Sequence, residues 1–117
     1  RTNTPLQSFV TMNDEAYVEF AQAMAHRIFT EGGATAADRL KFALRLTLAK
    51  PLEANRLAAL TELYEGELAH YKKETAAAKD LYGKTVPLPE GADVSEMAAL
   101  TVVANVLLNL DAILMKG

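Results

Sequence analysis

The sequence of 117 residues contains no cysteine and no tryptophan. The absence of cysteine excludes a disulfide scaffold, a thiolate metal site and a cysteine nucleophile. It does not fix the compartment, because many exported proteins also lack cysteine. Basic residues are not in excess, since the formal net charge is −3 and the pI is about 5.3. The composition therefore offers no electrostatic footprint for nucleic acid.

Half of the residues are hydrophobic and 23% are charged, which is typical of a globular protein. No strand pattern and no fixed-period repeat occurs, and the apolar residues recur at helical spacing. We therefore predict an all-α fold, a compact bundle of about four main helices. We expect residues 1–12 to form an extended N-terminal arm and residues 13–117 to form a single helical domain.

Capping signals set the expected limits of the helices. A first helix should begin at Asn13 and end at Gly32 and Gly33. Thr35 and Asp38 resemble a capping box that opens a second helix, which ends near residue 49 before a proline. A third helix should span about 53–74, on the outside of the bundle, with a short turn over 76–82 after it. The last should begin at residue 93 and run to about 115.

The last predicted helix is the most apolar part of the chain, because no lysine or arginine occurs between Met97 and Met115. Its length is close to that of a membrane span. The polar side chains within it argue against insertion, since a carboxylate in mid-span costs about 2.5–3.5 kcal/mol. We therefore expect this helix at the centre of the domain.

The chain begins with Arg1 rather than methionine and has no charged-then-apolar leader. We therefore expect it to be a piece of a longer protein. The predicted arm contains Leu6, Phe9 and Val10, which are too apolar to leave in water, so we expect the arm to pack onto the body of the domain.

Glu67 and His70 have the one spacing with a metal precedent, because residues three apart share a helix face. Di-iron bundles need two such motifs and two further glutamates. We therefore interpret the pair as part of a solvated face and predict no metal, no cofactor and no catalytic residue. The other histidine, His26, lies in a plain amphipathic run, which does not support a hydrolytic triad.

Two further groups have a functional and a structural interpretation. The aromatic residues lie on apolar stripes, where a stacking platform for sugar or base is the alternative to ordinary packing; they are Tyr17, Phe20, Tyr64 and Tyr71. Asn105, Asn109 and Asp111 interrupt the most apolar helix. Because buried polar groups must be paired, we favour an internal hydrogen-bonded clasp over a binding site for these three.

Several stretches in register resemble one family, the C-terminal domain of unknown function in large planctomycete cytochrome C domain-containing proteins. The strongest is LLNLD at 107–111. Lys50 stands where the resemblance leads us to expect arginine. The other matching stretches are RTNTPLQ at 1–7, MND at 12–14 and FxxRLxLxKP at 42–51.

The resemblance implies a module of a large exported protein with an extracytoplasmic location, and it supplies no catalytic residue. We therefore expect a non-catalytic structural or interaction module that packs against the upstream domains of its own polypeptide or against a protein partner. The alternative is an accessory part of a substrate site, for example a glycan site, in a larger enzyme. A pocket with exposed aromatic residues would favour the enzyme, and a flat apolar patch would favour docking.

Asp111 gives a stability test, because it falls on the apolar face that contains Leu107. We expect it to be protonated or paired, first with Arg45, second with Arg39 and third with backbone N–H groups of the arm or of a helix start. Breaking a buried pair typically costs about 3–5 kcal/mol, whereas an apolar replacement of both partners is nearly neutral. Urea titration should therefore show severe destabilisation by Asp111→Ala, and recovery when Asp111→Leu is combined with Arg45→Met. A cost below about 0.5 kcal/mol would place Asp111 on the surface.

Overall fold

The computed structural model describes the backbone of residues 15–47, 54–82 and 86–116, and the side chains of residues 18–46, 56–82 and 86–109. The all-α prediction is confirmed, because these ranges contain five α-helices and no strand. Four are long and one has seven residues. They are α2 (Glu15–Glu31), α3 (Ala36–Thr47), α4 (Ala54–Lys73), α5 (Thr75–Leu81) and α6 (Val94–Lys116).

The caps predicted at Thr35 and Asp93 and the glycine stop after α2 lie at the expected residues, whereas Asn13 lies outside the described part of the chain. Thr35 Oγ1 accepts a hydrogen bond from the backbone N–H of Asp38 at 3.1 Å, at the start of α3. At the start of α6, Glu96 Oε1 accepts from the backbone N–H of Asp93 at 3.2 Å, which is the returning half of a capping box. Gly33 follows α2 with φ of +117°, a value that side chains rarely allow.

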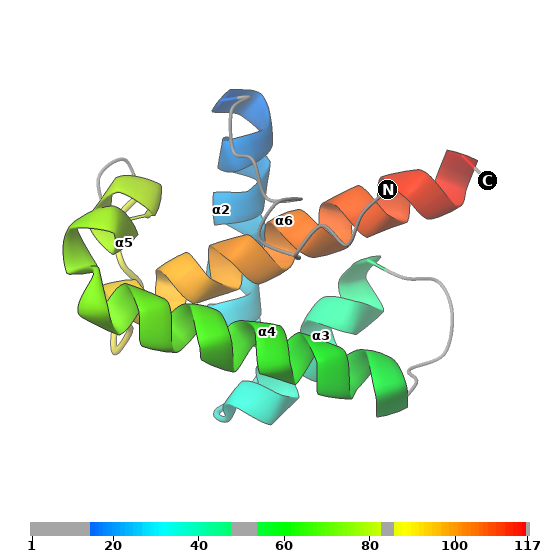
Figure 1. Ribbon diagram of the computed structural model, residues 1–117, viewed down its shortest axis with the longest axis horizontal. Coiled ribbons are helices and arrows are strands. Elements are labelled where there is room, and N and C mark those ends of the chain that lie inside the picture. The colour runs from blue at the N-terminus through cyan, green and yellow to red at the C-terminus, as the bar shows by residue number, and fades with distance from the viewer. Residues whose placement is uncertain (1–14, 48–53, 83–85, 117) are drawn as a thin grey trace.

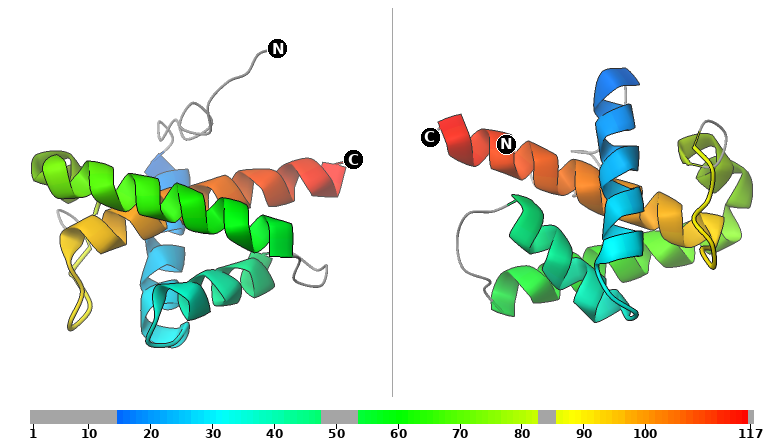
Figure 2. Two further views of the ribbon diagram at one scale, coloured as in Figure 1. Left: turned by 60° about the horizontal axis from the view of Figure 1, so that its bottom comes forward. Right: turned by 180° about the vertical axis from the view of Figure 1, so that it is seen from behind.

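Helix α6 lies at the centre of the fold, as predicted (Figure 1). Every residue from Met97 to Leu107 is buried. In Figure 2, α4 runs alongside α6 in the opposite direction, whereas α2 crosses α6 steeply. Helices α2, α3, α4 and α5 all contact α6. Within the described ranges, no helix combines the length and apolar character needed to cross a membrane.

The side chains of the surrounding helices explain these two modes of packing. Helix α2 presents Ala21 and Ala25 to the core, and neither side chain is exposed, so the backbones of α2 and α6 can approach closely. Helix α4 instead buries the larger Leu60, Leu63 and Tyr64. Burying a leucine side chain stabilises the fold by about 1.5–3 kcal/mol. The packing of α4 against α6 therefore contributes strongly to the free energy of unfolding.

Two buried side chains join the ends of helices by hydrogen bonds to backbone carbonyl groups. Gln22 of α2 donates from Nε2 to the carbonyl oxygen of Leu81 at 2.7 Å, which ties α2 to the last residue of α5. Ser95 of α6 donates from Oγ to the carbonyl oxygen of Tyr71 at 3.2 Å, which ties the start of α6 to the last turn of α4. These bonds satisfy carbonyl groups that a helix end leaves without a partner.

Three expectations need correction. Phe20 is not on the buried face of α2, because 67% of it is exposed; the core-facing stripe instead follows Ala21, Ala25 and Ile28. Glu67 is not on a solvated face, since only 6% of it is exposed. The segment after α4 is a helix, α5, and not only a turn. The predicted arm at 1–12 lies outside the described residues.

Candidate functional site

Polar side chains recur every four residues along the buried part of α6. Thr101 is fully buried, and its hydroxyl donates to the carbonyl oxygen of Met97 at 2.7 Å. Asn109 donates from Nδ2 to the carbonyl oxygen of Asn105 at 2.8 Å. Both side chains are thus satisfied by the backbone of their own helix, one turn earlier.

Asn105 is the exception on this stripe. It is 1% exposed, and neither Nδ2 nor Oδ1 has a hydrogen-bond partner among the described residues. The expected clasp is therefore wrong for Asn105, because the side chain of Asn109 bonds to its backbone and not to its amide group. The side chain of Asp111 lies outside the described part of the chain, and Arg45, its first expected partner, is exposed.

Tyr64 of α4 lies close enough to Arg39 of α3 and to Glu96 at the start of α6 for their charges to act on its phenol. Burial, strengthened by the negative charge of Glu96, raises the pKa of Tyr64 to about 12, although the positive charge of Arg39 opposes part of this rise. The guanidinium carbon of Arg39 lies 3.9 Å from the centre of the Phe29 ring, a cation–π geometry. Arg39, the second expected partner of Asp111, therefore stacks on an aromatic ring. Tyr64 is 5% exposed, so it packs in the core and offers no stacking platform.

Glu67 and His70 do not form a shared ligand face. Glu67 is buried, and burial of the phenol together with the charge of Glu67 raises the pKa of Tyr71. His70 is exposed, and its ring packs edge-on against that of Tyr71 at a centroid distance of 4.8 Å. Among the described residues, no three His, Asp or Glu side chains are close enough together to hold a metal ion.

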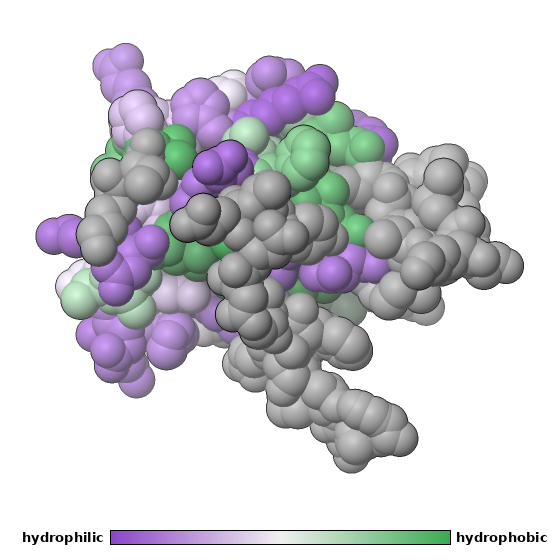
Figure 3. Space-filling view, turned by 90° about the horizontal axis from the view of Figure 1, so that it is seen from above, coloured by the Kyte–Doolittle hydropathy of each residue, from purple (hydrophilic) through white to green (hydrophobic). Residues whose placement is uncertain are grey.

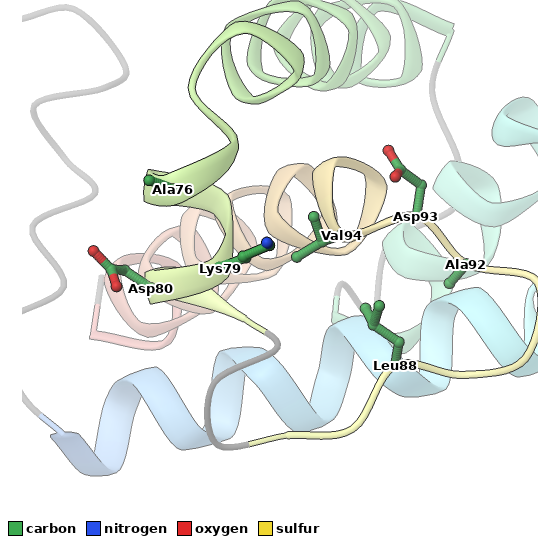
Figure 4. Close-up of a pocket in the computed structure, with 7 residues that line it drawn as sticks. All are labelled: Ala76, Lys79, Asp80, Leu88, Ala92, Asp93 and Val94. Carbon is green, nitrogen blue, oxygen red and sulfur yellow. The ribbon is translucent and has the colours of Figure 1, made fainter.

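An open hollow lies between α5, the loop over residues 86–93 and the first residue of α6 (Figure 4). Its volume is about 580 Å³. None of the side chains that line it is aromatic; they are Ala76, Lys79, Asp80, Leu88, Ala92, Asp93 and Val94. No sequence motif links the residues that line the hollow, because tertiary packing brings α5, the loop and the start of α6 together.

Two large hydrophobic side chains are exposed within the described ranges, namely Phe20 on α2 at 67% and Leu88 in the loop at 42%. Figure 3 shows that apolar side chains reach the surface between hydrophilic ones on the face seen from above. On α2, the charged residues Arg27 and Glu31 follow Phe20 by about two and three turns on the same side of the helix, and both are exposed. Phe20 is therefore an aromatic side chain on an otherwise polar helix face.

Asn105 provides a test of the buried stripe. A buried amide without a partner costs about 1–3 kcal/mol, so replacing it by an apolar side chain of similar shape should be neutral or stabilising. We expect Asn105→Leu to keep or raise the free energy of unfolding in urea titration. The matched Asn105→Asp variant should be strongly destabilised, because it buries a charge. A loss of more than about 2 kcal/mol in Asn105→Leu would show that the amide is paired.

Tyr64 provides a test in alkaline solution. The phenol ionises near pH 10 in the unfolded chain and near pH 12 in the folded protein, so the folded state favours the neutral form. Its contribution to stability is fully present below pH 10 and is lost as the pH rises from 10 to 12. We expect the unfolding free energy to fall by about 2–3 kcal/mol more over this range in the wild type than in Tyr64→Phe. The unfolding free energies of the wild type and of Tyr64→Phe are measured by urea titration at about pH 9, 10, 11 and 12. An equal fall in both proteins would contradict this assignment.

Comparison with known proteins places the chain in a family. Residues 1–64 match the family described as "Protein of unknown function (DUF1553)", and these residues are more than half of the chain. No curated protein matches the chain. No solved structure matches it either. The matched region covers α2, α3 and the first half of α4, and it includes three of the four stretches that carry the resemblance found in the sequence. The chain belongs to this family of proteins of unknown function.

Proposed function

We propose that this chain is a non-catalytic helical interaction module of a longer exported protein, and that it docks the upstream domains of the same polypeptide through the outer face of α2. The observation that carries the proposal is Phe20, an aromatic side chain that is 67% exposed. Exposed aromatic side chains are enriched at the centres of protein interfaces, where truncation often costs about 2 kcal/mol or more.

The position of α2 in the chain supports this choice of partner. Helix α2 is the first described helix, so of the described helices it is nearest in sequence to any domain that precedes residue 1. Its outer face also carries Arg27, which forms an exposed ion pair with Glu31 at 3.1 Å. Protein interfaces usually have a centre enriched in aromatic residues and a polar rim, and Phe20 with these charged residues is consistent with that composition.

The resemblance to the C-terminal domain of planctomycete cytochrome C domain-containing proteins supports the wider setting. By that resemblance, the module lies at the C-terminus of a large exported bacterial protein with an extracytoplasmic location. A fold does not by itself decide such a role, so docking is supported here by the exposed Phe20 on α2.

The alternative role, an accessory part of a glycan-binding site, has weaker support. Such sites combine exposed aromatic side chains with convergent polar groups. The hollow between α5 and α6 has polar groups but no aromatic lining, and Tyr64 and Tyr82 are buried.

The test is binding of this chain to the remainder of its own polypeptide, measured by isothermal titration calorimetry. We expect Phe20→Ala to weaken binding by about 2 kcal/mol, as truncation of an interface anchor does. Its own stability should change by less than about 0.5 kcal/mol, because the side chain is exposed.

The control for this test is another truncation on the same helix. His26 is also exposed on α2, but it lies about a third of a turn around the helix from Phe20, outside the face that we assign to docking. His26→Ala should therefore bind like the wild type. Equal binding by Phe20→Ala and the wild type would refute the proposal.

A further inference from the structure

We draw no further inference here: the strongest candidate, the open hollow between α5, the loop over residues 86–93 and the start of α6, carries none, because nothing in the structure shows what covers its apolar side chains Leu88 and Val94.

Discussion

The whole fold depends on the burial of one helix that is apolar on all sides. From Met97 to Leu107, α6 carries no charged residue and exposes almost no surface. A helix of this kind cannot be stable in water on its own, because each exposed aliphatic side chain forgoes about 1.5–3 kcal/mol of burial. It needs neighbours on every side, and α2, α3, α4 and α5 supply them.

The same burial determines what polar groups on α6 can do. Water does not reach them, so each must find a partner within the protein or remain without one. Thr101 and Asn109 bond to carbonyl groups one turn earlier on the same helix, and this solution needs no other element. Asn105 does not use it, although it stands between them in the same repeat. Stability alone does not explain an amide at this position, and no contact among the described residues explains it either.

Features set by local chemistry were predictable from the sequence, and features set by tertiary packing were not. The caps at Thr35 and at Asp93 with Glu96 depend on neighbours three residues away, so the sequence contains both partners. The central position of α6 was also predictable, because it has no lysine or arginine between Met97 and Met115 and therefore no charged side to turn to water. Phe20 and Glu67 were assigned wrongly because the rotation of a helix about its own axis is set by what it packs against. Close approach to α6 favours small residues such as alanine on the buried face of α2, which turns Phe20 outward.

The outer face of α2 and the hollow beside α5 are held in fixed relation by the core that separates them. Phe20 lies on α2, and the hollow lies between α5 and the start of α6. Gln22 is two residues from Phe20 and is 5% exposed, and it donates a hydrogen bond at 2.7 Å to Leu81 at the end of α5. A buried hydrogen bond of this kind is hard to break without a replacement, because the amide group would be left without a partner. Helices α2 and α5 also both pack on α6. Helices α2 and α5 are therefore held in a fixed relation to each other on the surface of α6.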